Sequence, residues 1–168
     1  MSLNLEKIVK NSRIAFESKI DSIKKDRVLK KFANLLLSNK KKILKENHKD
    51  IKFANKKKLN ENLIKRLELD DRKINGIINS INQIIKIKDP TNKILEKWKR
   101  PNKLVIKKVT VPIGVIAVIY ESRPNVTSDV ASLCFKSGNA VILRGGSEAF
   151  NTNKIISNLF RKSLMVCG

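Results

Sequence analysis

The fold of this protein is decided by residues 114–148, GVIAVIYESRPNVTSDVASLCFKSGNAVILRGGSE. Gly114–Tyr120 is almost entirely apolar and rich in β-branched residues, which predicts a strand covered on both faces. Asn125–Lys136 has helical periodicity with Val126, Val130, Leu133 and Cys134 along one side, and Gly138 suits a left-handed helix terminator. Ala140–Leu143 predicts a second buried strand. A strand, a helix and a strand in this order predict a parallel β–α–β unit with a right-handed crossover.

A further helix is expected after the turn Arg144–Glu148, and its periodic apolar residues are Ile155, Ile156, Leu159 and Phe160. Two other apolar stripes with helical spacing lie upstream, formed by Val28, Leu29, Phe32, Leu35 and Leu36, and by Ile74, Ile77, Ile78, Ile81, Ile84 and Ile85. Between the two stripes, residues 43–58 predict a polar helix. Asp70 or Asp71 could cap the second helix, and Asp89-Pro90 is expected to end the helical region. Leu104–Val111 is β-branched and partly alternating, as in a half-exposed strand.

The chain is therefore predicted to be an α/β protein in three parts. These are a helical region over residues 1–90, a connecting strand segment over residues 91–112, and the opening of a doubly wound sheet over residues 113–168. A sheet of only two parallel strands has unprotected edges and little area for helices to cover. We therefore expect the chain to be truncated.

Composition limits the classes of function. The chain has 168 residues, 37 Lys and Arg against 15 Asp and Glu, and a formal net charge of +22. The lysine runs lack interleaved aromatic residues that could stack on bases, which favours a solvated helical surface, although a basic nucleic-acid-binding protein stays an alternative. No stretch is apolar enough to span a membrane, and the amino terminus reaches charged residues too early for a signal peptide. A soluble cytoplasmic protein is expected.

Few residues offer catalytic chemistry. Asn125 follows the first strand of the β–α–β unit, where open parallel sheets place their ligands, but helix capping is the commoner use of an asparagine at a helix start. Arg144–Glu148 is a glycine-rich turn before a helix, which is either an anion-binding turn or an ordinary connection. Cys134 is expected in the core, Cys167 matches no nucleophile motif, and His48 is expected on the surface. Two distant cysteines fit neither a disulfide framework nor a zinc site, and no other metal site is expected.

Two motifs carry a resemblance to a known family. The run Tyr120-Glu121-Ser122-Arg123-Pro124-Asn125-Val126-Thr127 and the run Gly138-Asn139-Ala140-Val141-Ile142-Leu143-Arg144-Gly145-Gly146-Ser147-Glu148 resemble γ-glutamyl phosphate reductase, also called glutamate-5-semialdehyde dehydrogenase. The resemblance covers nearly the whole chain, but well under half of a family member. The family belongs to the aldehyde dehydrogenase superfamily, so the resemblance implies an incomplete Rossmann-like NADP-binding domain over residues 113–168. It also implies an oligomerisation-type strand segment over residues 91–112.

The resemblance also implies an activity and roles for site residues. The reaction would be the NADPH-dependent reduction of L-glutamate 5-phosphate to L-glutamate 5-semialdehyde and phosphate, in proline biosynthesis. Asn125 would donate to the oxyanion, Arg123 would bind the substrate or form a structural ion pair, and the turn at Arg144, Gly145, Gly146, Ser147 and Glu148 would contact NADP(H). Full-length members would form homo-oligomers and could act with glutamate 5-kinase.

The resemblance sets a limit on activity as well. The family's nucleophilic cysteine would lie beyond residue 168, so we expect this chain to be inactive alone. A stand-alone nucleotide-binding module stays a second alternative. No specific nucleic acid and no membrane are expected as partners.

Overall fold

The computed structural model describes residues 2–168. Its amino-terminal half is helical, with α1 (Ser2–Glu17), α2 (Ser22–Ser38), α3 (Lys40–Lys56), α4 (Glu61–Leu67) and α5 (Asp71–Lys86). Then come β1 (Ile94–Lys99), β2 (Val105–Val109), β3 (Val115–Tyr120), α6 (Pro124–Lys136), β4 (Ala140–Gly145), the short 3₁₀-helix η1 (Ser147–Ala149) and α7 (Phe150–Cys167). The order of elements confirms the predicted α/β class.

Two of the long helices, α2 and α5, begin where a short acidic side chain can satisfy free amides. The carboxylate of Asp21 accepts from the backbone amide of Lys24 at 2.8 Å, and the carboxylate of Asp70 accepts from the amide of Lys73 at 2.6 Å. Such N-caps compensate for the missing backbone acceptors of a first helical turn. The predicted cap at Asp70 is confirmed, and Asp71 is the first residue of α5.

The main hydrophobic core lies between α2, α5 and α7. Both predicted stripes contribute, and the buried members of the core are Leu29, Phe32, Ala33, Leu36, Ile43, Ile74, Ile77, Ile81, Ile84, Ile156 and Leu159. The ring of Phe160 packs edge-on against Phe32 at a centroid distance of 5.0 Å and against Phe135 at 5.7 Å. The amino-terminal helices and the β–α–β unit are therefore joined by a continuous apolar interior.

A polar contact joins the same two parts. The carboxylate of Asp50 on α3 accepts hydrogen bonds from the backbone amides of Asn151 and Thr152 in the first turn of α7, and from their side chains. A buried carboxylate suits this place, because the first amides of a helix lack backbone acceptors and carry partial positive charge. Asn47, one turn earlier on α3, donates to the carbonyl oxygen of Leu67 and to the hydroxyl of Thr152.

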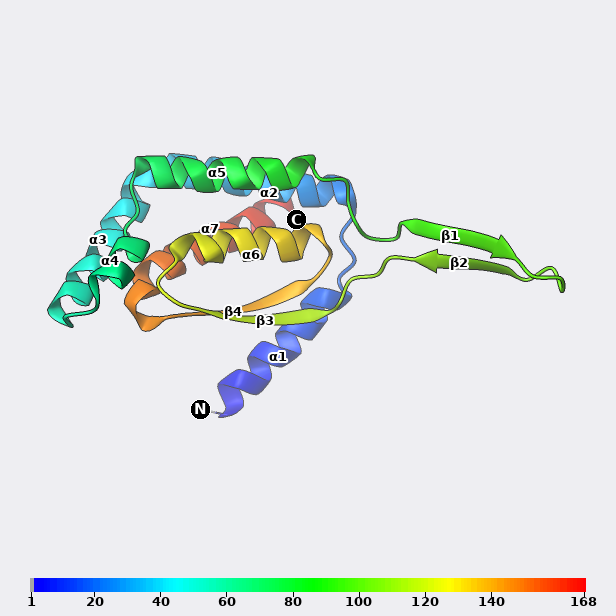
Figure 1. The fold of residues 1–168 in the computed structure, drawn as a ribbon, viewed down its shortest axis with the longest axis horizontal. Coiled ribbons are helices and arrows are strands. Elements are labelled where there is room, and N and C mark those ends of the chain that lie inside the picture. The colour runs from blue at the N-terminus through cyan, green and yellow to red at the C-terminus, as the bar shows by residue number, and fades with distance from the viewer. Residues whose placement is uncertain (1) are drawn as a thin grey trace.

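A two-stranded antiparallel hairpin of β1 and β2 projects from this body (Figure 1). The sequence predicted only the second strand, because β1 has little apolar–polar alternation. All six residues of β1 are exposed, and only Ile106 of β2 is partly covered. Trp98 pairs with Ile106 across the hairpin, and Glu96 forms an ion pair with Lys108 at 3.0 Å.

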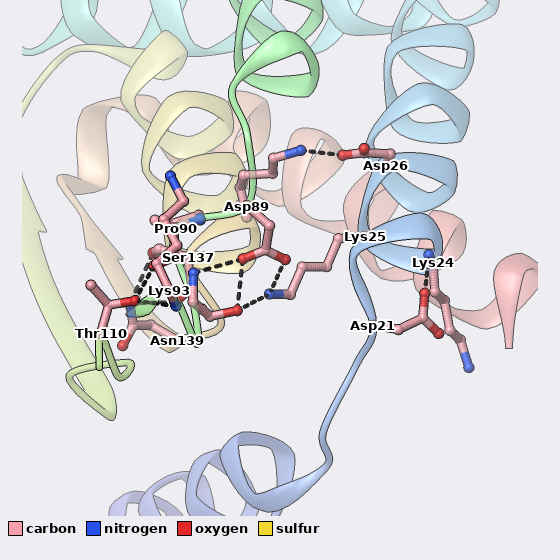
Figure 2. Close-up of polar contacts among 12 residues, drawn as sticks. Asp21, Lys24, Lys25, Asp26, Asp89, Pro90, Lys93, Thr110, Ser137 and Asn139 are labelled. Carbon is pink, nitrogen blue, oxygen red and sulfur yellow. Dashed lines mark hydrogen bonds and ion pairs between the residues drawn. The ribbon is translucent and has the colours of Figure 1, made fainter. Parts of the chain in front are cut away.

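Buried charges fix the base of the hairpin (Figure 2). The ammonium of Lys25 on α2 lies 2.8 Å from the carboxylate of Asp89, which also accepts from the amide and hydroxyl of Thr91. Burial raises the pKa of Asp89, but the bonds from Lys25 and Thr91 outweigh it and lower that pKa to about 2. A second buried lysine, Lys136 on α6, pairs with Asp26. The first contact attaches the loop after α5 to α2, and the second attaches α6 to α2.

The predicted β–α–β unit is confirmed. β3 and β4 pair in parallel, from Val115 opposite Ala140 to Tyr120 opposite Gly145, and α6 connects them. Gly138 has a φ of 75°, as expected for a glycine that ends a helix, and a β-carbon there would lie 3.0 Å from Pro112.

Two details of the predicted burial are wrong. β3 alternates between exposed and half-buried residues, and Ile119 is 80% exposed, whereas the sequence predicted a strand covered on both faces. In the described chain only α1 lies on the far side of the two strands, so half of the apolar residues of β3 face outward (Figure 1). Leu133 is also exposed, because the buried face of α6 consists mainly of small and hydroxyl residues, including Thr127, Ser128, Ala131 and Ser132.

Candidate functional site

The candidate site begins at the carboxyl end of β3. The chain leaves the strand through Ser122, which is buried and has a φ of 36°, and enters α6 at Pro124. Proline favours the first position of a helix because its fixed φ is already helical and the missing amide is not needed there. Arg123 occupies the N-cap position without a capping side-chain bond. Asn125 therefore lies inside the first turn, so the alternative that it caps the helix is wrong.

The amide of Asn125 is exposed and held on one side. Its Nδ2 donates to Oδ2 of Asp129, one turn further along α6, at 3.1 Å. A carboxylate can only accept, so the nitrogen of the amide faces Asp129. The second N–H of the same amide makes no bond within residues 2–168. The arrangement leaves Asn125 with a donor for an external oxygen.

Arg123 and Asn125 line one open depression of about 470 Å³. Its other wall comes from the end of α4 and from α5, and includes Arg66 and Lys73. Arg123 makes no ion pair with any carboxylate in the described part of the chain, so the alternative of a structural ion pair has no support. The structure thus brings together two of the residues that the sequence singled out.

The turn after β4 is arranged differently. Arg144 is still part of the strand and is exposed, and Ser147 is exposed at the start of η1. Glu148 points back to the end of β3, where its Oε1 accepts from the amide of Ser122 at 2.7 Å and from the Ser122 hydroxyl at 2.9 Å. Burial raises the pKa of Glu148, but bonds from its own amide and from Ser122 lower the pKa overall. This carboxylate therefore joins the two turns.

The two glycines of this turn are packed tightly. A β-carbon at Gly145 would lie 2.2 Å from Nδ2 of Asn153 and 3.0 Å from the Tyr120 hydroxyl, and one at Gly146 would lie 2.0 Å from Oε1 of Glu148. The Glu148 carboxylate therefore fills the space beside Gly146. Arg144 and Ser147 are not in the lining of either depression near Arg123. The two groups of predicted residues occupy neighbouring turns but not one cavity.

A polar chain missed by the sequence analysis lies beneath these turns. The Tyr120 hydroxyl and the Thr127 hydroxyl are 2.6 Å apart, and Thr127 also donates to Oδ1 of Asn153 on α7 at 2.9 Å. Burial raises the pKa of Tyr120, and the bond to Thr127 opposes this effect. Tyr120 and Thr127 lie in the quoted motif at a spacing of seven residues, but their contact depends on the angle between β3 and α6.

Other candidate residues contribute no chemistry here. Cys134 is buried on α6, and burial raises the pKa of its thiol, whereas Cys167 lies at the end of α7. His48 is exposed on α3. Within residues 2–168 no three metal-binding side chains gather into a cluster. None of the helices described is both long and apolar enough to cross a membrane.

Comparison with known proteins identifies close relatives, although no family model matches the chain. The γ-glutamyl phosphate reductase of Hydrogenobaculum sp. is 49% identical over 147 residues, which cover 88% of this chain and 33% of the relative. That of Caldanaerobacter subterraneus is 47% identical over 149 residues, which cover 89% of this chain and 36% of the relative. The chain thus spans about a third of the length of the curated relatives that it matches.

Solved structures agree. The γ-glutamyl phosphate reductase of Thermotoga maritima superimposes with a TM-score of 0.92 at 40% identity, over 96% of this chain and 39% of that protein. The reductase of Saccharomyces cerevisiae gives 0.90 at 31% identity, over 95% and 41%. A probable aldehyde dehydrogenase from Listeria monocytogenes gives 0.70 at 14% identity, over 99% and 34%, which indicates a shared fold alone. The chain therefore belongs to the γ-glutamyl phosphate reductase family and corresponds to an amino-terminal part of its members.

Proposed function

We propose that this chain provides the oxyanion donor and part of the cofactor site of a γ-glutamyl phosphate reductase. The reaction is the NADPH-dependent reduction of L-glutamate 5-phosphate to L-glutamate 5-semialdehyde and phosphate, in proline biosynthesis in the cytoplasm. The observation that carries the proposal is the Asn125 amide, which is exposed beside an open depression with one N–H held by Asp129. The names of the relatives support the reduction of γ-glutamyl phosphate, and NADPH as the hydride donor is part of the proposal.

Asn125 would act on the carbonyl oxygen of the substrate. In acyl phosphate reduction a thiolate displaces phosphate to give a thioester, and hydride then reduces the thioester to the aldehyde. Negative charge develops on the carbonyl oxygen in both steps, so a fixed N–H donor at that oxygen lowers both barriers. The hydrogen bond to Asp129 fixes the amide before substrate arrives, which reduces the reorganisation needed during the reaction.

The thiolate would have to come from outside residues 2–168. Cys134 lies more than two turns beyond Asn125 on α6, is buried, and has a raised pKa, all of which oppose a role as nucleophile. Cys167 is at the far end of α7. We therefore propose that the 168-residue chain does not turn over by itself.

The turn after β4 would contact NADP(H), which supplies the hydride when bound. The residues partly fit this cofactor: Arg144 is an exposed guanidinium suited to a 2′-phosphate, and Ser147 is an exposed hydroxyl donor. Gly145 and Gly146 have no side chains of their own, but they fit less well, because Asn153, Tyr120 and Glu148 already occupy the space beside them. Glu148 fits less well, because its carboxylate is already engaged by Ser122. We assign Glu148 to holding the turn rather than to binding ribose.

A chimaera tests the proposal. Residues 1–168 would be joined to the remaining part of the Hydrogenobaculum reductase and assayed in reverse, as NADP⁺ reduction that requires both phosphate and glutamate 5-semialdehyde. We expect activity, and we expect Asn125→Ala to lower kcat by about 10²–10³-fold, as for loss of another oxyanion donor. Asn158→Ala, on the exposed side of α7, is the matched control and should have no effect. A folded chimaera without phosphate-dependent activity, or an Asn125→Ala variant with full activity, contradicts the proposal.

The hairpin is proposed as a self-association element. An isolated two-stranded hairpin is marginally stable in water, and this one exposes Ile94, Leu95, Trp98, Leu104, Val105 and Val109. A second copy of the protein would cover these side chains. Contact with glutamate 5-kinase is proposed for a different reason: direct transfer would protect an acyl phosphate from water.

A further inference from the structure

The depression beside Asn125 carries charges of both signs, and the proposed chemistry at the carbonyl does not use them. Its cationic lining residues are Arg66 at the end of α4, Lys73 on α5 and Arg123 before α6. Its acidic lining residues are Glu68 and Asp129. The rest of the lining is small, polar or apolar, with Leu69, Gly76, Ile77, Ser80 and Asn125.

Two of the three cations are available to a ligand. The ammonium of Lys73 is already engaged, since it donates to the carbonyl oxygen of Glu68 at 2.6 Å and to that of Lys65 at 3.3 Å. Arg66 and Arg123 form no ion pair within the part of the chain that the structure describes, and both are exposed. The same two arginines also line the adjoining depression, which has a volume of about 460 Å³. Two free guanidinium groups that line the same depression suit the oxygens of an anionic group.

Asp129 provides the opposite charge on the same surface. Its Oδ2 accepts from Asn125, and its Oδ1 is buried without a donor in residues 2–168. A buried carboxylate oxygen without a donor is costly, and rotation of the carboxyl group can present either oxygen to an incoming cation. The Asp129 carboxylate would repel a phosphate-like anion and would attract an ammonium group. A group that is anionic only therefore suits this depression less well than a zwitterion.

We propose that the depression binds the amino-acid end of the glutamyl substrate. Arg66 and Arg123 hold the α-carboxylate, and Asp129 accepts from the α-ammonium. This inference rests on the proposed function, because it places the carbonyl of the same substrate at Asn125. Asp129 lies one turn from Asn125, roughly 5.4 Å along the helix, and the glutamyl side chain has two methylene groups between its α-carbon and that carbonyl. The site would therefore distinguish glutamyl substrates from acyl phosphates without an α-amino acid group.

Binding to the 168-residue chain tests the assignment directly. The probes are L-glutamate, glutarate, which lacks only the ammonium group, and inorganic phosphate, with side-chain N–H signals of arginine and asparagine followed by NMR. We expect saturable binding of L-glutamate, about tenfold weaker binding of glutarate, and about tenfold loss for Arg66→Gln or Arg123→Gln, as for a charge-assisted bond. Arg161→Gln on α7 removes the same charge from a surface away from the depression and should change nothing.

Asp129→Asn separates the two halves of the site. It should lower the affinity for L-glutamate, which loses the partner of its ammonium group, and raise the affinity for glutarate, because the repulsion by the Asp129 carboxylate is removed. Circular dichroism is the check on folding. Equal affinity of the wild-type chain for L-glutamate and glutarate refutes the role of Asp129. Phosphate binding that is tighter than glutamate binding and depends on Arg66 and Arg123 refutes the carboxylate assignment in favour of a phosphoryl site. The absence of saturable glutamate binding, or its loss in Arg161→Gln, refutes the site altogether.

The chimaera separates failure of this inference from failure of the proposed function. If the chimaera is active but Arg66→Gln and Arg123→Gln leave KM for glutamate 5-semialdehyde unchanged, the recognition site is wrong and the reductase assignment stands. If the isolated chain binds L-glutamate selectively but the folded chimaera has no phosphate-dependent activity, the reductase assignment fails and the binding site stands.

Discussion

Replacement of Asp50 by asparagine should strongly destabilise this protein. Asp50 is 2% exposed, and its carboxylate accepts from the amides of Asn151 and Thr152 at 3.1 and 2.8 Å and from their side chains at 2.8 and 2.6 Å. In Asp50→Asn one carboxylate oxygen becomes an amino group, which would face donors that it cannot accept from. The first turn of α7 would also lose the nearby negative charge that favours a helix amino terminus.

The magnitude follows from the number and kind of bonds. A hydrogen bond to a charged group contributes roughly 1.5–3 kcal/mol, and four bonds to one carboxylate are not additive. Two of the four bonds should be lost, so Asp50→Asn should lower the free energy of unfolding by about 3 kcal/mol. This is a large part of the ~5–15 kcal/mol that is typical of a domain.

Urea unfolding followed by circular dichroism at the helical band measures this loss. Glu46→Gln is the matched control, since it removes the same charge one turn earlier on α3, where Glu46 forms only a surface ion pair with Lys49 at 2.7 Å. That change should cost less than about 1 kcal/mol. Thr152→Val removes one donor from the same carboxylate and should fall between the two, which keeps the test valid if Asp50→Asn does not fold. Equal effects of Asp50→Asn and Glu46→Gln would refute the reasoning.

Three further predictions concern other parts of the molecule. The pKa of Asp89 falls from 3.8 to about 2 on folding, so this carboxylate contributes roughly 2 kcal/mol to the free energy of unfolding above about pH 4, and the contribution is lost as the pH falls to about 2. When stability is measured as a function of acid pH, Asp89→Asn should lack this pH-dependent contribution. An acid profile that is the same in the variant and the wild type contradicts the role of the bond between Asp89 and Lys25. Gly145→Ala should cost about 1–3 kcal/mol in urea unfolding, because the new methyl group displaces Asn153, and a neutral effect would mean that the turn relaxes freely. In sedimentation velocity, Trp98→Lys should shift the protein toward monomer if the hairpin mediates self-association, whereas a wild-type chain that is already monomeric at high concentration argues against that role.

The sequence and the structure agree where local chemistry is decisive. Gly138 ends α6 in the left-handed region because only glycine adopts that conformation at low cost, and Asp70 caps α5 because a short carboxylate reaches the first amides. The apolar spacing of α2 and α5 predicted which faces are buried. The parallel order of β3 and β4 followed from the intervening helix.

The candidate site was only partly predictable. Asn125 and Arg123 came from the motif, and the structure places both at one depression. Arg66 and Lys73 were not predicted as site residues, because lysine and arginine are so frequent in this chain that charge alone singles out no position. The link between Glu148 and Ser122 was also missed, since a carboxylate in a first helical turn gives no sign of a partner 26 residues away.

The sequence by itself determined the local elements, because caps, glycine terminators and apolar periodicity act within a few residues. It also determined the family, through two motifs whose order and spacing are specific. Tertiary structure alone decided that Asp50 would cap a helix a hundred residues away, that Asn125 would lie inside α6 rather than cap it, and that β3 would be half open. The physical reason is that hydrogen-bond partners and burial depend on how distant elements pack, and a one-dimensional pattern records only the type of each residue and not its neighbours in space.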